Sequence, residues 1–247
     1  MALISISGRE IEVQLVIFDK DGTLVDFKQT WISLIKTLMD VLGGYTPMNE
    51  SLRQRIQDAL GIFVDRGEID GYGPLAMGTF TECDALLTYC LYREGIRWDR
   101  AQEIVHEAGQ KVFRSDLRSQ NVRPAPGAMK LLKILKQRGI PSAVATNDKM
   151  ADAQTDIDVI GASEYIDLVI GADSVVHSKP APDMVKTICE HFNTAPEKTI
   201  LIGDTIMDAL LGRNAGVMLT IGVIGIVTEE ILREHMDLVI SSLEEIT

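Results

Sequence analysis

The chain has 247 residues, of which 46% are hydrophobic and 24% charged, and its formal net charge is −12. A chain of this length buries a full core and has room for one large domain or for a domain with a sizeable insertion. The negative charge disfavours binding to nucleic acid or to anionic membranes through a broad basic face. It does not exclude a phosphorylated ligand, because a metal ion, a lysine and backbone N–H groups act on a phosphate at contact distance.

The chain lacks the sequence signals of a membrane or secreted protein. No apolar run approaches the ~18 residues of a membrane span, and residues 1–6 have neither a basic start nor a long apolar stretch. We therefore expect a cytoplasmic protein. Its cysteines, Cys83, Cys90 and Cys189, show no metal-ligand spacing, and we expect them to be buried free thiols.

An apolar strand is predicted over residues 16–18, and two carboxylates, Asp19 and Asp21, follow it directly. A strand interior excludes water, so a carboxylate at its end lies where a phosphate and a metal ion are held partly out of solvent. Asp19 is thus placed as a nucleophile, and Gly22 allows a sharp turn that moves Asp21 toward a leaving group. The alternative is an ordinary strand followed by an Asp-Gly turn.

Residues 28–122 change character, with helical periodicity and no convincing central strand. Apolar stripes predict helices over about 31–42 and 52–60, each followed by glycine. Thr79 and Asp99 each stand three residues before Glu or Gln, the spacing of a capping box at a helix start. About four helices are expected, enough for a small inserted bundle.

Residues 70–79 are too rich in glycine to predict a helix. Their glycines would let the backbone approach a ligand, and Tyr72 offers a ring face and a hydroxyl, so Tyr72 is a candidate substrate-binding residue. An ordinary linker between two helices is an equally supported interpretation.

Strand-like and helix-like segments alternate over the C-terminal half, which predicts βαβ units and a doubly wound parallel sheet. Polar residues follow the predicted strands: Thr146 and Asn147 after the second, and Asp204 after a later one. Open α/β sheets bind ligands at these strand ends. The predicted helices cover 128–138 and 183–192, and the predicted strands 140–145, 165–170 and 199–202.

Asp204 and Asp208 are four residues apart and are predicted to share one side of a helix that begins near residue 205. Two like charges at this spacing cost a few tenths of a kcal/mol unless a cation lies near them, so the pair predicts a metal site. The alternative is a helix N-terminus that favours acids through its dipole, which suits Asp204 better than Asp208.

These motifs, in this order, resemble the phosphatases of the haloacid dehalogenase (HAD) superfamily, and most closely the phosphoglycolate-phosphatase-like branch. The motifs are Asp19-Lys20-Asp21-Gly22-Thr23, Thr146-Asn147, Lys179-Pro180 and Gly203-Asp204-Thr205-Ile206-Met207-Asp208. The resemblance implies a HAD-like Rossmannoid core over residues 1–27 and 123–247. It also implies a helical cap of the first class, C1, over residues 28–122.

The resemblance further implies a phosphoric monoester hydrolase that uses Mg²⁺. Asp19 would attack phosphorus, and Asp21 would protonate the leaving oxygen and later activate water. Thr146, Asn147 and Lys179 would hold the phosphoryl group, although a lysine in a loop is more often simply solvated. The implied Mg²⁺ ligands are Asp19, the Asp21 backbone carbonyl, Asp204 and Asp208.

Asp21 argues against a dehalogenase, which needs neither a second acid nor a metal. A phosphomutase remains the closest enzymatic alternative, and a phospho-receiver-like module is the alternative outside enzymes, although such modules are about half this length and lack a cap. The expected partner is a small phosphorylated metabolite, such as phosphoglycolate or a sugar phosphate. Neither nucleic acid nor membrane is expected as a partner, and oligomeric state is left without a prediction.

Overall fold

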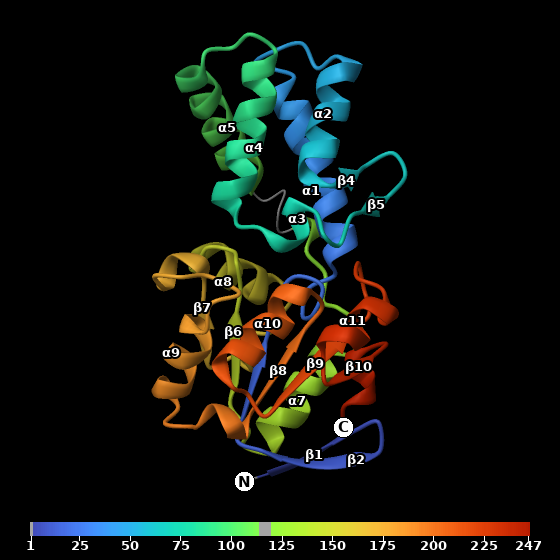
Figure 1. The fold of residues 1–247 in the computed structure, drawn as a ribbon, viewed down its shortest axis with the longest axis vertical. Helices are drawn as coiled ribbons and strands as arrows, with labels where there is room; N and C mark the ends of the chain where they lie inside the picture. Colours follow the sequence, from blue (N-terminus) through green and yellow to red (C-terminus); the bar gives the residue numbers. More distant parts are fainter. Residues whose placement is uncertain (1, 114–119) are drawn as a thin grey trace. The chain divides into compact units, whose positions relative to one another are not determined.

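A computed structural model describes residues 2–113 and 120–247. The chain forms two compact units, one from Met1–Phe27 with Arg123–Thr247 and the other from Lys28–Val122 (Figure 1). The first is an α/β unit and the second is mainly helical.

A six-stranded parallel sheet is the centre of the α/β unit, with strand order β10-β9-β8-β3-β6-β7 (Figure 1). The central strand β3 is fully buried, as expected for a parallel sheet whose two faces are both covered. The strands are β3 Leu15–Phe18, β6 Ser142–Ala145, β7 Leu168–Ile170, β8 Thr199–Gly203, β9 Leu219–Val223 and β10 Leu238–Ile240. The predicted doubly wound parallel sheet is confirmed.

Helices connect and cover these strands. They are α7 Ala128–Gln137, α8 Met150–Val159, α9 Asp183–His191, α10 Ile206–Ala215 and α11 Glu229–His235, with the short 3₁₀ helices η1 Ala172–Ser174, η2 Pro196–Lys198 and η3 Leu243–Glu245. Helix α9 packs on β6 and β7, and α10 on β8 and β9. Apolar residues of the sheet, such as Ile17 and Leu201, share one core with Val185 and Ile188 of α9.

The strand order reverses beside β3. In register, Phe18 lies opposite Val144 of β6 on one side and opposite Ile202 of β8 on the other. The chain therefore leaves β3 for a neighbour on one side and later returns to its other side. Such a switch point opens a crevice at the carboxyl ends of the strands, where open α/β sheets bind ligands.

An antiparallel hairpin, β1 Ala2–Ile6 and β2 Arg9–Val13, precedes the sheet. Its turn has Ser7 at φ 48° and Gly8 at φ 80°, the positive values that a two-residue hairpin turn requires. Ser5 and Thr247 exchange backbone hydrogen bonds of 2.6 and 2.9 Å, so the hairpin also pairs with the end of the chain. This hairpin was not predicted from the sequence.

The helical unit contains α1 Phe27–Leu42, α2 Glu50–Leu60, α3 Pro74–Met77, α4 Phe80–Arg93 and α5 Trp98–Phe113, with a short hairpin of β4 Ile62–Phe63 and β5 Glu68–Ile69. Helix α4 packs against α5 and α2. Trp31, Phe80 and Phe113 form an aromatic cluster with ring centroids 5.4–5.9 Å apart. Contacts of this kind stabilise a core beyond the area they bury.

Two of the predicted helix-end signals in this unit are observed, and one is not. Gly61 ends α2 at φ 71°, and Thr79 forms the predicted capping box with Glu82. Asp99, in contrast, lies in the first turn of α5, which begins one residue earlier, so its assignment as a cap was wrong. The 70–79 segment contains the one-turn helix α3, because Pro74 supplies a helical φ at its start. The β4–β5 hairpin was not predicted.

Two strands of the α/β unit begin later than predicted. Ile140 donates its N–H to Leu135 at the end of α7, and Pro141 has no N–H to offer, so β6 begins only at Ser142. The amides of Tyr165 and Ile166 donate to Ala162 in a turn, so β7 begins only at Leu168.

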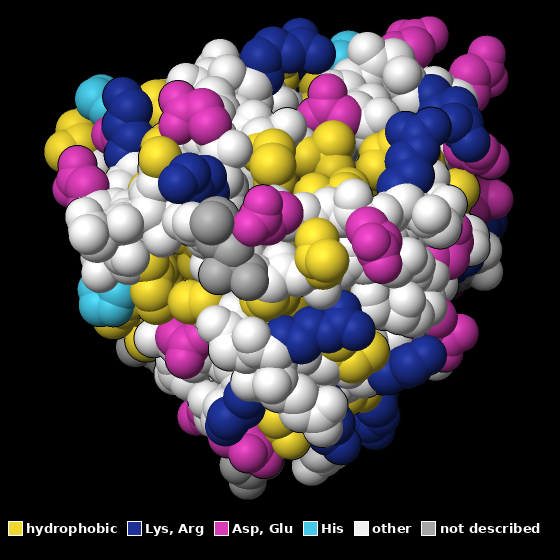
Figure 2. All heavy atoms as spheres, turned by 90° about the horizontal axis from the view of Figure 1, so that it is seen from below, with side chains coloured by type: hydrophobic (Ala, Val, Ile, Leu, Met, Phe, Trp, Pro, Cys, Tyr) yellow, Lys and Arg dark blue, Asp and Glu magenta, His cyan; other side chains and the backbone are white. Residues whose placement is uncertain are grey.

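Three expectations from the composition concern surface charge, membrane-spanning helices and the cysteines. Figure 2 shows Lys and Arg side chains interspersed with Asp and Glu on the face that it views. Among the described residues no helix is long and apolar enough to cross a membrane. Cys90 and Cys189 are buried free thiols as expected, whereas Cys83 is only half-buried.

Candidate active site

Asp19 lies at the carboxyl end of β3, at the switch point. Its N–H donates to the Ile202 carbonyl at 2.8 Å, so pairing with β8 continues to this residue. The chain then turns back, because the Val25 amide donates to the Lys20 carbonyl at 2.9 Å and Gly22 has φ +89°. Glycine is favoured at such a φ. The Asp-Lys-Asp-Gly run thus places its first carboxylate at the strand end and its second on the turn.

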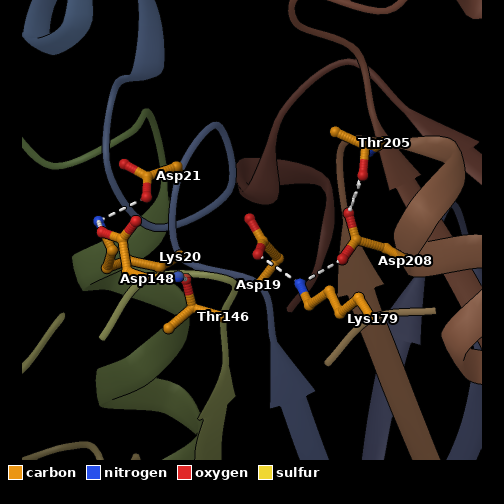
Figure 3. Close-up of polar contacts among 8 residues, drawn as sticks. All are labelled: Asp19, Lys20, Asp21, Thr146, Asp148, Lys179, Thr205 and Asp208. Carbon is orange, nitrogen blue, oxygen red and sulfur yellow. Dashed lines mark hydrogen bonds and ion pairs between the residues drawn. The ribbon is translucent and has the colours of Figure 1, made fainter. Parts of the chain in front are cut away.

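Lys179 lies between two of the predicted carboxylates (Figure 3). Its Nζ is 2.5 Å from Asp19 Oδ1 and 2.5 Å from Asp208 Oδ1, and the side chain is buried. Burial opposes the charged amine, but the two carboxylates prevail, and the pKa of Lys179 is raised. Burial raises the pKa of Asp19 to about 7, although Lys179 acts in the opposite direction. Lys179 is therefore a fixed cation beside Asp19, not a solvated loop lysine.

Asp208 is held by the start of α10. Its Oδ2 accepts from the Thr205 N–H at 3.1 Å and from the Thr205 hydroxyl at 2.7 Å, which forms a capping box. A Cβ on Gly203 would lie 2.3 Å from Asp208 Cγ, so the carboxylate packs directly on that glycine. Both oxygens of Asp208 thus have protein donors, one from Thr205 and the other from Lys179.

Asp204 lies outside α10, which begins at Ile206, so the prediction that Asp204 and Asp208 share a helix face was wrong. They nevertheless meet, because oxygens of Asp19, Asp204 and Asp208 lie within 4.8 Å of one another. We call these three residues the acidic triad.

The Asp204 carboxylate is the member of the triad whose hydrogen-bonding capacity is not satisfied by the described residues. Its two oxygens are buried and, among the described residues, have no hydrogen-bond partner. Burial, followed by the charges of Asp19 and Asp208, raises the pKa of Asp204 well above its ordinary value. A buried carboxylate without a donor is costly, and a hard cation with oxygen ligands satisfies it. The donor set of the triad therefore fits a Mg²⁺ ion.

Thr146 follows β6 and is buried. Its N–H donates to the Ile170 carbonyl at 3.0 Å, which fixes the backbone, and its Oγ1 accepts from the Asp148 N–H at 3.1 Å. Because Oγ1 accepts this bond, the hydroxyl hydrogen is directed elsewhere and can donate to a ligand oxygen. Asn147 comes next and is half-buried.

Tyr72 belongs to the helical unit and is 54% exposed. Its N–H donates to Asp70 Oδ1 at 2.9 Å, a turn contact within the same segment. Tyr72 thus belongs to the helical unit, whereas the other predicted site residues belong to the α/β unit.

Lys20 was missed as a functional candidate. It is fully buried, and its Nζ lies 2.6 Å from Asp21 Oδ2, 3.0 Å from Asp148 Oδ2 and 2.6 Å from Asp156 Oδ2. Burial raises the pKa of Asp21 to about 6, against the effect of Lys20. A lysine between two acids at a buried strand end was a usable signal, but its partners 128 and 136 residues away have no sequence pattern.

A family model described as haloacid dehalogenase-like hydrolase matches residues 13–216. The chain belongs to this family. The match covers β3, Lys179, the acidic triad, and Lys20 with its three partner acids. This hydrolase is therefore an enzyme of the class that the four ordered motifs predicted.

Curated relatives of the hydrolase are named as phosphatases. It is 30% identical to "Probable phosphatase IndB" of Dickeya dadantii over 85% of this chain and 80% of the relative. It is 26% identical to the phosphorylated carbohydrates phosphatase of Thermotoga maritima, over 86% of each. It is 27% identical to the phosphoglycolate phosphatase of Psychrobacter arcticus, over 83% of this chain and 81% of the relative.

Solved structures share the fold. A protein of Thermotoga maritima, proposed to be a beta-phosphoglucomutase, superposes with a TM-score of 0.67 at 23% identity and covers 94% of this chain and 95% of its own. A HAD-superfamily hydrolase of subfamily IA from Geobacter sulfurreducens gives 0.63 at 18% identity, covering 94% of each chain. At these identities the likeness concerns the fold.

Proposed function

We propose that this hydrolase is a Mg²⁺-dependent phosphatase that hydrolyses a small phosphate monoester through an aspartyl-phosphate on Asp19. The observation that carries the proposal is the pairing of Asp19 with Lys179 beside the Asp204 carboxylate, which has no hydrogen-bond partner among the residues that the structure describes. A nucleophile, a fixed cation and a carboxylate that suits a hard cation, at one switch point, are the parts that phosphoryl transfer requires.

The phosphatase class rests on the family and on the names of its relatives, which act on phosphorylated carbohydrates and phosphoglycolate. We propose a substrate of that size and charge, a phosphoglycolate- or sugar-phosphate-like metabolite. Nothing in the mechanism below depends on which one it is.

In the first half-reaction, a carboxylate oxygen of Asp19 attacks phosphorus, and the bond from phosphorus to the ester oxygen breaks. The electron pair goes to that oxygen, which takes a proton from Asp21 and leaves as an alcohol. Asp21 suits this role because burial raises its pKa to about 6, so a useful fraction carries a proton near neutral pH.

In the second half-reaction, water attacks phosphorus and gives a proton to the Asp21 carboxylate. The bond between phosphorus and the Asp19 oxygen breaks, which releases inorganic phosphate and restores both side chains. One residue serves as acid and then as base, so each turnover leaves Asp21 in its initial state.

Lys179 and Thr146 act on the phosphoryl oxygens. The fixed charge of Lys179 favours a trigonal phosphoryl group beside Asp19 and reduces repulsion between the nucleophile and its anionic target. The Thr146 hydroxyl hydrogen donates to another phosphoryl oxygen, and Asn147, next in the chain, is assigned to the same group. Asp208 orients Lys179 through the 2.5 Å contact.

The metal site is assigned to Asp19, Asp204 and the Asp21 backbone carbonyl, with Asp208 as a ligand or as the residue that holds Lys179 beside it. When bound, Mg²⁺ neutralises charge on the phosphoryl oxygens and on the triad. The residues of this chain do the rest: they hold the nucleophile, the proton and the phosphoryl group.

A phosphomutase is the second candidate, because a structural neighbour is proposed to be one. It would use the same residues but return the phosphoryl group to its substrate. The family match over residues 13–216 argues against a phospho-receiver-like module.

A panel of phosphorylated metabolites, assayed for phosphate release with Mg²⁺, tests the proposal. Asp19→Asn is nearly isosteric, so it should fold and lose activity. Asp58→Asn, an exposed acid of α2, is the matched control and should retain activity. Activity of Asp19→Asn equal to wild type would overturn the nucleophile, and full activity in excess chelator would overturn the metal.

A further inference from the structure

Beside the acidic triad the structure holds a second group of buried charges, which we call the Lys20 cluster: Lys20, Asp21, Asp148 and Asp156. The three acids come from three places in the fold, namely the turn after β3, the loop after β6 and helix α8. Lys20 and Asp156 are completely buried. Figure 3 shows Lys20 directed to Asp21 and Asp148, on the opposite side of Asp19 from Lys179.

The carboxylates of the Lys20 cluster are close enough to suggest a second metal, since their oxygens lie within 4.8 Å of one another. The Lys20 ammonium already occupies the position between these carboxylates. An ammonium has three N–H donors, and Lys20 Nζ lies within 2.6–3.0 Å of one oxygen from each acid. An ion bound to the same oxygens would meet the ammonium at close range, so the lysine itself serves as the cation here.

The two lysines of the site therefore differ in whether they contact all of the carboxylates around them. Lys179 contacts Asp19 and Asp208 and leaves the Asp204 carboxylate without a donor among the described residues. Lys20 reaches all three acids of its own cluster. The first arrangement suits a bound cation at Asp204, and the second suits a permanent cross-link between the three acids.

We propose that Lys20 is a positioning residue for Asp21: it ties the Asp21 carboxylate to Asp148 and Asp156 and so holds it in place for proton transfer. The inference rests on the proposed function, because it assigns a support to the acid and base of that reaction. Lys20 acts through Asp21 and not on the substrate, since its side chain is completely buried and its ammonium is directed at the three acids.

The Lys20 ammonium restrains the position of the Asp21 carboxylate. Asp21 precedes Gly22 in a turn that is closed by backbone hydrogen bonds, such as that from the Gly22 N–H to the Val25 carbonyl at 2.8 Å, and these bonds fix the main chain but do not select the side-chain rotamer of Asp21. Asp148 and Asp156 belong to other elements, so the ammonium joins the turn to the framework of the sheet and α8. Proton transfer needs a donor within hydrogen-bond reach of the leaving oxygen, and a small displacement lowers the rate steeply.

The test uses two variants of the full chain. Lys20→Met removes the ammonium and keeps the chain length, but it leaves three buried acids and should lower thermal stability. The double variant Lys20→Met with Asp156→Asn removes one buried charge of each sign, so it should recover part of that stability. In both variants Asp21 lacks the ammonium. Asp158→Asn, an exposed acid on the same helix, is the matched control.

The readout compares two leaving groups. An alkyl phosphate needs a proton on its leaving oxygen, whereas p-nitrophenyl phosphate releases a stable phenolate without one. We expect both variants to lose about 10²-fold in kcat on the alkyl phosphate, with KM changing far less. On p-nitrophenyl phosphate we expect a rapid burst of p-nitrophenol equal to the enzyme concentration, followed by slow turnover, because hydrolysis of the aspartyl-phosphate still needs Asp21.

The outcomes separate the two proposals. If wild type is active, Asp19→Asn is inactive and the variants lose equal factors on both substrates without a burst, the positioning role is overturned while the proposed function stands. The same conclusion follows if the double variant regains activity along with stability, because Lys20 would then be only structural. If activity of the wild type does not depend on Asp19, the proposed function itself has failed.

Discussion

A Cβ placed on Gly22 would lie 1.9 Å from Oδ2 of Asp204, a separation that only glycine avoids. The turn that carries Asp21 and the end of β8 that carries Asp204 therefore meet without space for a side chain. Gly22 has two reasons to be glycine, this contact and its φ of +89°.

The contact predicts that Gly22→Ala abolishes activity by displacing the Asp204 carboxylate or the Asp21 turn. Gly161→Ala is the matched control, because Gly161 has φ +73° with nothing within 4 Å of an added Cβ. Each substitution should cost about 1–2 kcal/mol of unfolding free energy for the backbone alone, and only Gly22→Ala should remove turnover. Equal activity of the two variants would show that the contact with Asp204 is unimportant.

Mg²⁺ should stabilise the protein through Asp204. Binding to the folded state alone raises the unfolding free energy by about 2.7 kcal/mol when free Mg²⁺ is about 100 times its Kd. Thermal unfolding with and without Mg²⁺ measures the effect. Asp204→Asn should remove most of the Mg²⁺ response while making the metal-free protein more stable, since it replaces a buried carboxyl whose ionisation burial opposes and which has no donor among the described residues. If Mg²⁺ stabilised the Asp204→Asn variant as much as the wild type, Asp204 would not be a ligand of the ion.

Stability without metal should depend on pH in an unusual direction. Burial raises the pKa of Asp19 to about 7 and that of Asp21 to about 6, from an ordinary 3.8. The folded state therefore binds more protons than the unfolded state between about pH 4 and pH 7, and its stability falls as pH rises through that window. Denaturant unfolding at several pH values with chelator present checks this. Asp19→Asn should reduce the slope, and a flat profile in wild type would contradict the raised pKa values.

Hydrolase and mutase differ in the fate of the phosphoryl group. With a preferred substrate we expect free phosphate to appear in a one-to-one ratio with substrate loss. Product analysis by phosphate assay and by NMR of the sugar or acid gives the ratio. Isomerised substrate with little phosphate released would favour the mutase.

Tyr72 stays a prediction for substrate recognition. Its side chain is 54% exposed in the helical unit, so Tyr72→Ala should fold normally and raise KM or reorder the substrate panel. Tyr89→Ala, at 44% exposure on α4, is the control. The Mg²⁺ requirement should persist in both. Kinetics identical to wild type on every substrate would leave residues 70–79 as a linker.

The elements that the sequence located well are those whose signals are local. Apolar runs of strand length placed β3 and β8, and helix stop signals such as Gly61 coincide with an observed end. Strand starts were predicted too early where a backbone N–H donates to a carbonyl of the preceding helix or turn and not to a neighbouring strand, as at Ile140 and Tyr165. The β1–β2 hairpin had no assigned signal, although it pairs with Thr247 at the other end of the chain.

The sequence by itself determined the family, the parallel α/β sheet and the order of the acidic motifs, because each depends on short local patterns and on their order along the chain. The tertiary structure alone decided which charges meet. It paired Lys179 with Asp19 and Asp208, left Asp204 without a donor among the described residues, and buried Lys20 among acids from three elements. The pairs of Lys179 with Asp19 and of Lys20 with Asp156 join residues that are 160 and 136 positions apart, and no spacing along the chain records the path of strands and helices that brings them together.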